Sequence, residues 1–115
     1  MTKTNLIRAA IAGLALLILS LIHIYRDALT TAASETGGIV SIEEHAVDGG
    51  LGGAIAEVLM EAGVFPRFLV RMGLRNTFSS VVGSQQYLRK VYSLDAAAIA
   101  RTVFAKLGTA VPALA

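Results

Sequence analysis

The stretch that most constrains the fold of this chain is a short β-branched run that leads through glycines into an amphipathic helix. Residues 38–44, GIVSIEE, are bounded by turn residues and predict a buried strand. Four glycines follow between positions 49 and 53, and apolar residues then recur at helical spacing up to Ala62, with Gly63 placed to end the helix. A strand, a turn and a helix in this order favour an α/β fold, in which helical crossovers join parallel strands.

Further elements are predicted on both sides of this unit. They are a helix from residue 25 that stops at glycines 37 and 38, a strand at 67–72 after Pro66, a loop at 73–84, a short helix begun by Ser84, and a last helix capped by Ser93 or Asp95 and ended by Gly108. Two strands are too few to cover two helical layers, so a piece of the fold is expected to be missing.

Composition and length exclude several classes of function. The 115 residues are enough for one domain. The absence of cysteine excludes a thiol nucleophile, a thiolate zinc site and disulfide bonds. The net charge is only +2 and the basic residues are scattered without aromatic interleaving, so we expect no nucleic-acid partner.

The glycine turn could receive an anion, because a strand, glycines and a helix N-terminus can present backbone N–H groups to a phosphate. The dinucleotide-binding fingerprint does not fit. If Gly50 and Gly52 are its first two glycines, Ile55 stands where a third small residue belongs. The next strand offers Arg71 instead of an acidic residue for a ribose, and the sequence has no Gly-Lys-Ser/Thr motif. Nucleotide binding is therefore disfavoured.

The charged residues beside the turn allow two other chemistries. The metal-ligand types here are Glu43, Glu44, His45 and Asp48. Consecutive strand residues point to opposite faces, so these side chains would not all converge on one ion. Glu44 with His45 could serve as acid and base, although no nucleophile or second base accompanies them. The residues alone favour a structural role, in which the acidic pair and His45 bond local backbone and the glycines permit close packing of helix on sheet.

Three ordered stretches of the sequence carry a family resemblance. They are AASETGGIVSIEEHAVDGGLGGAIAEVL, VRMGL with the phenylalanine loop behind it, and YLRKVYSLDAAAIARTVFAKLG. Over residues 26–108 they resemble the C-terminal domain of transketolases and related thiamine-diphosphate enzymes. The family-motif residues are Glu43, Glu44, His45, Gly49, Gly50, Gly52, Tyr92 and Asp95. Ser93 stands where the family usually has glycine, a departure that affects only the local turn.

The resemblance implies a partial three-layer, Rossmann-like α/β domain with a mainly parallel sheet. The domain is expected to be truncated at its N-terminal side, because the family's first strands should precede Tyr25 and are not visible. The complete enzyme would transfer a two-carbon ketol unit between sugar phosphates in the pentose phosphate pathway. Thiamine diphosphate and magnesium would bind between the two preceding domains, and a cytoplasmic location is implied.

No catalytic, cofactor-binding or metal-binding residue of the family maps onto this sequence, so the resemblance implies that the chain alone is inactive. Its expected role is structural, in packing against the remaining transketolase domains or a partner subunit through homodimer-type contacts. Two alternatives from other classes stay open. One is a small membrane-anchored interaction module that reuses the domain, and the other is a regulatory module that binds an anionic metabolite at glycines 49–53.

Residues 1–25 predict a long hydrophobic helix. Lys3 and Arg8 precede an uncharged apolar run, which favours a membrane anchor through residues 6–25. A signal sequence is the second interpretation, with Ala33 as a small-residue cleavage position, although that cut would fall within the family-like helix.

A chimeric reading frame is the third interpretation of this N-terminal segment. The residues LSLIHI at 19–24 are encoded in frame by CTGTCTCTTATACACATC, the common transposon end of sequencing libraries. His23 is then an adapter codon, and otherwise an interfacial residue at a helix end. At the other terminus, residues 109–115 are expected to form a flexible tail.

Overall fold

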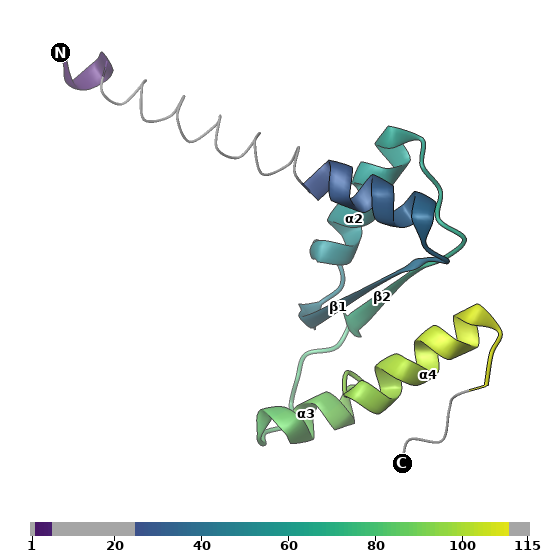
Figure 1. The fold of residues 1–115 in the computed structure, drawn as a ribbon. Coiled ribbons are helices and arrows are strands. Elements are labelled where there is room, and N and C mark those ends of the chain that lie inside the picture. Colours follow the sequence, from purple (N-terminus) through teal and green to yellow (C-terminus); the bar gives the residue numbers. More distant parts are fainter. Residues whose placement is uncertain (1, 6–24, 111–115) are drawn as a thin grey trace.

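Two parallel strands and the helices around them make up the fold (Figure 1). A computed structural model describes residues 2–5 and 25–110. In chain order the main elements are a helix at 25–35, β1 at Ile39–Ala46, α2 at Leu51–Ala62, β2 at Leu69–Leu74, α3 at Gln85–Val91 and α4 at Ala96–Leu107. The α/β class predicted from the sequence is confirmed.

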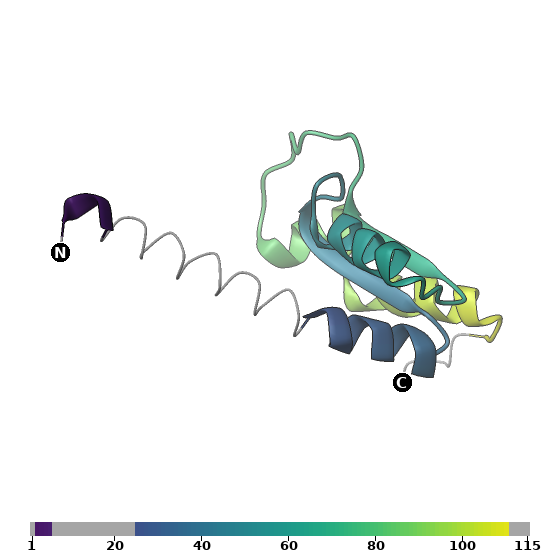
Figure 2. The ribbon, with the colours of Figure 1, turned by 90° about the horizontal axis from the view of Figure 1, so that it is seen from above.

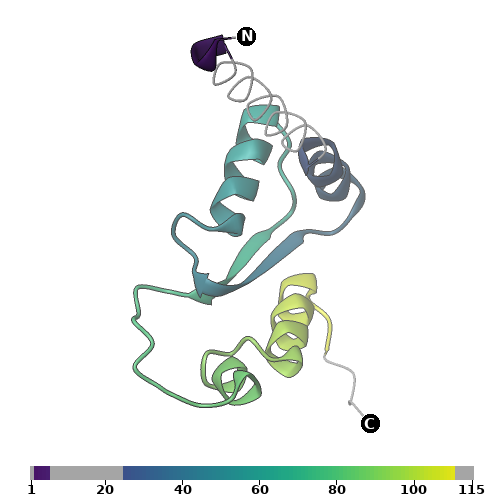
Figure 3. The same cartoon turned by 90° about the vertical axis from the view of Figure 1, so that its left-hand side faces the viewer.

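The strands β1 and β2 pair in parallel, and α2 is the crossover between them. The register pairs Ile39 with Leu69, and it shifts before Ala46 meets Leu74. Helix 25–35 and α2 lie on one face of the sheet, with α2 running along the strands, and α3 and α4 lie on the other (Figures 1, 2 and 3). This arrangement agrees with part of a Rossmann-like domain, whose parallel sheet carries helices on both faces.

The hydrophobic core lies between the sheet and the two helices that precede β2. Its buried members are Ala33, Ile55 and Leu59, and the apolar residues packed against them are Leu29, Ile39, Val64 and Leu69. Burying one Leu or Ile side chain contributes about 1.5–3 kcal/mol, so these few residues carry much of the stability. On the opposite face of the sheet Ile42 remains 43% exposed. One face is therefore sealed and the other is only partly covered.

The strand β2 begins two residues later than the predicted strand at 67–72, and it includes Gly73. Glycine usually marks turns, which is why the sequence placed Gly73 in a loop. In the structure a Cβ atom at this position would lie 2.8 Å from Cγ1 of Val47 and 2.9 Å from the carbonyl oxygen of His45. The predicted end of the strand was wrong because this glycine lets the end of β1 approach closely.

The helix ends follow the predicted capping residues. Ser84 and Asp95 each accept a hydrogen bond from a backbone N–H in the first turn of α3 and α4, at 3.2 and 3.3 Å. Of the two predicted caps for the last helix, Asp95 is therefore the one used. Gly63 and Gly108 both adopt the left-handed conformation that ends a helix, with φ of 68° and 71°.

Ser93, in the turn between α3 and α4, also adopts a left-handed conformation, with φ of 57°. This conformation costs a non-glycine residue about 1–2 kcal/mol, which a glycine at position 93 would not pay. Glycine also has more conformational freedom in the unfolded chain, and this offsets part of the gain in stability. Ser93→Gly is therefore expected to raise the free energy of unfolding by about 0.5–1 kcal/mol. Urea unfolding of the full chain would measure this change. A lower midpoint for the variant would contradict the assignment of strain to Ser93.

The hydrophobic helix predicted over residues 1–25 lies mostly outside the described residues, as do His23 and residues 111–115 of the tail predicted at 109–115. Within residues 2–5 and 25–110, none of the helices has the length and apolar character needed to cross a membrane.

Candidate functional site

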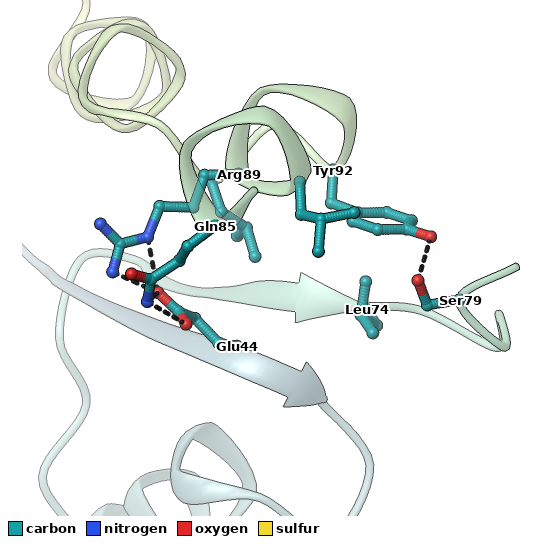
Figure 4. A pocket seen from close by; sticks show the side chains of 8 residues that line it. Glu44, Leu74, Ser79, Gln85, Arg89 and Tyr92 are labelled. Atoms are coloured by element: carbon teal, nitrogen blue, oxygen red, sulfur yellow. Dashed lines mark hydrogen bonds and ion pairs between the residues drawn. The ribbon is translucent and has the colours of Figure 1, made fainter. Parts of the chain in front are cut away.

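Of the consecutive motif residues Glu43, Glu44 and His45 in β1, Glu43 and His45 lie on one face of the sheet and Glu44 on the other. Glu43 is only 5% exposed and lies on the α2 face, whereas Glu44 lies on the opposite face beside α3 (Figure 4). The exposed His45 places Nε2 3.4 Å from Oε1 of Glu43 and Nδ1 2.6 Å from the carbonyl oxygen of Ala46. Alternation along a strand separates neighbouring side chains in this way. In the part of the chain that the structure describes, no group of three or more His, Asp or Glu residues could hold a metal ion.

Glu43 caps the N-terminus of α2 from within β1. The backbone N–H of Leu51 donates to Oε1 of Glu43, and the N–H of Gly52 donates to Oε2 at 3.1 Å. Gly50, which precedes the helix, supplies no side-chain cap of its own. A carboxylate at this position pairs with N–H groups that have no partner within the helix and interacts favourably with the helix dipole.

The glycines of the motif make room for this contact. A Cβ atom on Gly50 would collide with the Glu43 carboxylate. On Gly52 it would lie 2.5 Å from both Oγ of Ser41 and Cγ of Arg71. Gly49 has φ of 73° and so occupies the region that favours glycine. The turn thus permits the close approach of helix and sheet that the sequence suggested.

An anionic ligand at this turn would compete with the Glu43 carboxylate for the same backbone N–H groups. The N–H groups of Leu51 and Gly52, which a phosphate would use, already donate to Glu43. The buried carboxylate would also repel an incoming diphosphate, because like charges disfavour one another most where water is excluded. The residues of the turn therefore do not fit thiamine diphosphate or another phosphate ligand.

Glu44 joins the sheet to α3 through a contact that we call the clasp, made by Glu44, Gln85 and Arg89 (Figure 4). Gln85 Nε2 lies 3.0 Å from Oε2 of Glu44, and Arg89 Nε lies 2.6 Å from Oε1. The Nη2 group of Arg89 forms an ion pair with the same oxygen. Hydrogen bonds to Glu44, the one from Gln85 having the larger effect and the one from Arg89 the next, hold the pKa of Glu44 below its ordinary value.

This lowered pKa of Glu44 makes the contribution of the clasp depend on pH. A carboxyl group whose pKa is depressed on folding stabilises the protein above its unfolded-state value, about 4.3 for a glutamate, and loses that contribution as the pH falls through its folded-state pKa. Stability should therefore fall more steeply below about pH 4.5 in the native chain than in Glu44→Gln. Lys90 and Asp95, which line a neighbouring pocket with Glu44, are present in both proteins. Thermal unfolding against pH would measure the difference, and equal slopes would contradict it.

The clasp forms one wall of a pocket of about 360 Å³ between the sheet and α3. The pocket is lined by Glu44, Leu74, Ser79, Gln85, Leu88, Arg89, Tyr92 and Leu94 (Figure 4). Tyr92 donates its hydroxyl hydrogen to Oγ of Ser79 at 2.7 Å. Two motif residues, Glu44 and Tyr92, thus share one pocket, while Glu43, His45 and the glycines belong to the other face.

The sequence did not identify Gln85, Arg89 or Arg71 as parts of these contacts. Gln85 and Arg89 are four residues apart, a spacing that places both on one face of a helix and that signals a shared partner. No local pattern pairs them with Glu44, which lies 41 residues before Gln85. Arg71, whose side-chain stem faces Gly52, had been considered only in place of a ribose-binding acid.

Comparison with known proteins identifies relatives over most of the chain, although no protein-family model matches it. The 1-deoxy-D-xylulose-5-phosphate synthase 1 of Geobacter sulfurreducens is 37% identical over 92 residues, covering 77% of this chain and 14% of the relative. An apulose-4-phosphate transketolase subunit of Actinobacillus succinogenes is 34% identical over 73 residues, covering 64% of this chain and 23% of the relative.

A third relative is the 6-deoxy-6-sulfo-D-fructose transketolase subunit of a Clostridium species. It is 40% identical over 75 residues, which cover 65% of this chain and 22% of the relative. The chain thus spans less than a quarter of the length of each of these curated relatives. These matches confirm the resemblance indicated by the sequence motifs: the chain carries the C-terminal domain that transketolases share with 1-deoxy-D-xylulose-5-phosphate synthases.

Proposed function

We propose that this chain acts as the C-terminal domain of a transketolase-like, thiamine-diphosphate-dependent transferase, with a structural and subunit-packing role and no catalytic centre of its own. The observation that carries the proposal is the buried Glu43 carboxylate, which pairs with the N-terminus of α2. The stretch that resembles an active site in its composition is used to join a strand to a helix. Ketol transfer between sugar phosphates then belongs to the complete enzyme.

A partner subunit or further domains would supply the rest of that enzyme. Two of the relatives are named as transketolase subunits, which supports assembly with another chain. The two-stranded sheet and the exposed Ile42 support a larger, three-layer domain, because a parallel sheet is normally covered on both faces. Thiamine diphosphate and magnesium would bind in the completing domains.

A domain exchange tests the packing role directly. Residues 26–108 would replace the matching C-terminal segment of the Actinobacillus transketolase subunit, and the hybrid would be assayed for ketol transfer with its natural partner chain. We expect the hybrid to keep activity, and a second hybrid with Glu43→Ala to lose activity and assembly together. A hybrid that assembles normally but shows no ketol transfer would contradict a purely structural role.

Calorimetry of the full chain tests the absence of a cofactor site. Titration with thiamine diphosphate and Mg²⁺, and separately with inorganic diphosphate, is expected to give no binding heat at millimolar ligand. Saturable heat with thiamine diphosphate would overturn the proposal. Heat with inorganic diphosphate alone would instead support the regulatory alternative at glycines 49–53.

A further inference from the structure

The last two helices form one continuous unit. The turn between them is closed by backbone hydrogen bonds, among them Leu94 N–H to the carbonyl oxygen of Arg89 at 2.7 Å and Tyr92 N–H to that of Leu88 at 3.0 Å. Leu94 and Ala98 are buried, at 7% and 4% exposure. We call residues 85–108, from the start of α3 to the glycine that ends α4, the α3–α4 unit.

The α3–α4 unit is tied to β2 by an exposed segment, residues 75–84. Phe78 and Val82 in this segment are 99% and 93% exposed, so they contribute little packing. The bond between Tyr92 and Ser79 joins the α3–α4 unit to its own connecting segment and not to the sheet. A tether of this length and exposure can change its backbone angles without breaking core contacts.

Packing between the α3–α4 unit and the sheet is interrupted on both sides of the clasp. Two pockets, of about 360 and 470 Å³, open here, and both are lined by Glu44, Arg89 and Leu94. Figure 4 shows the first of them. Within the described residues, the side-chain hydrogen bonds that run from the α3–α4 unit to the strands all end on Glu44. Within the described residues, the unit is therefore held by this one polar contact and by apolar packing that includes the buried Leu94 and Ala98.

We propose that the α3–α4 unit opens and closes over the sheet as a hinged flap, with residues 75–84 as its hinge and the clasp as its latch. Opening separates Arg89 and Gln85 from Glu44 and uncovers the sheet face that carries Ile42. The opposite face, sealed by helix 25–35 and α2, stays intact, so opening is a local event distinct from global unfolding.

Hydrogen exchange on the full chain, followed by mass spectrometry, tests this device. The variants are Glu44→Gln and Arg89→Gln, and the matched controls are Glu57→Gln and Arg101→Gln, at exposed positions of α2 and α4. We expect about two- to five-fold faster exchange of amides in α3 and α4 for each clasp variant, and unchanged exchange in α2. Both controls should exchange as the native chain does.

Salt provides a second readout that needs no substitution. Raising NaCl from about 0.05 to about 1 M shortens the screening length from more than 10 Å to about 3 Å and should accelerate exchange in α3 and α4 of the native chain but not of Glu44→Gln. Equal acceleration of exchange in α2 would show that the whole structure opens, and it would contradict the local opening of the α3–α4 unit. Exchange in α3 and α4 that responds neither to salt nor to the clasp variants would overturn the latch.

Discussion

Replacement of Glu43 by alanine is expected to lower the free energy of unfolding by about 2–3 kcal/mol, because it removes two charge-assisted hydrogen bonds from a buried carboxylate. The N–H groups of Leu51 and Gly52 lose their partner inside the protein, and α2 loses the negative charge that its N-terminus favours. Urea unfolding of the full chain would give the change from the shift in midpoint at constant slope.

Two further variants separate the cap from a general effect of charge. Glu43→Gln keeps one carbonyl acceptor and is expected to fall between the native chain and Glu43→Ala. Glu57→Ala removes a carboxylate from an exposed position of the same helix and should change stability by less than about 0.5 kcal/mol. If Glu57→Ala were as costly as Glu43→Ala, the capping explanation would be wrong.

Two neighbouring glycines in α2 are expected to respond to alanine with opposite signs. At Gly52 the added methyl group would lie 2.5 Å from Oγ of Ser41 and from Cγ of Arg71, so helix and sheet must separate. We expect a loss of about 1–3 kcal/mol from this overpacking. At Gly53 the nearest atom, Nη1 of Arg71, is 3.9 Å away. There alanine should add up to about 1 kcal/mol through its higher helix propensity.

The pair of measurements contains its own control, since both variants make the same chemical change one residue apart. Thermal or urea unfolding of Gly52→Ala and Gly53→Ala should move the midpoint in opposite directions. An equal rise in the unfolding midpoint of both variants would show that the side chains of Arg71 and Ser41 can move aside at little cost. The glycine at position 52 would then not be required for packing.

Local patterns in the sequence predicted much of the fold. The caps Ser84, Gly63 and Gly108 act within their own helices, and the β-branched run of β1 marks its strand in the same way. Such features depend on residues a few positions apart. They can therefore be identified before any tertiary contact is known.

The remaining features depend on contacts between distant segments. Gly73 lies within β2 and, having no side chain, leaves room for Val47, which stands 26 positions earlier. The residues next to Gly73 in the sequence give no sign of this contact. The same holds for the clasp, since nothing around Glu44 specifies a partner in α3. The chemistry of Glu43 was also ambiguous, because a carboxylate beside glycines suits either a ligand site or a cap, and only the direction of its side chain decides.

The cap from Glu43 to α2 has a consequence for how the chain folds. Leu51 follows Glu43 by only eight positions, so the contact closes a short loop at a small cost in chain entropy. Pairing β1 with β2 requires a much longer closure, since Ile39 meets Leu69 thirty positions later. The strand, turn and α2 are thus expected to become ordered before the sheet, and the carboxylate would guide the order of folding events as well as the stability of the final structure.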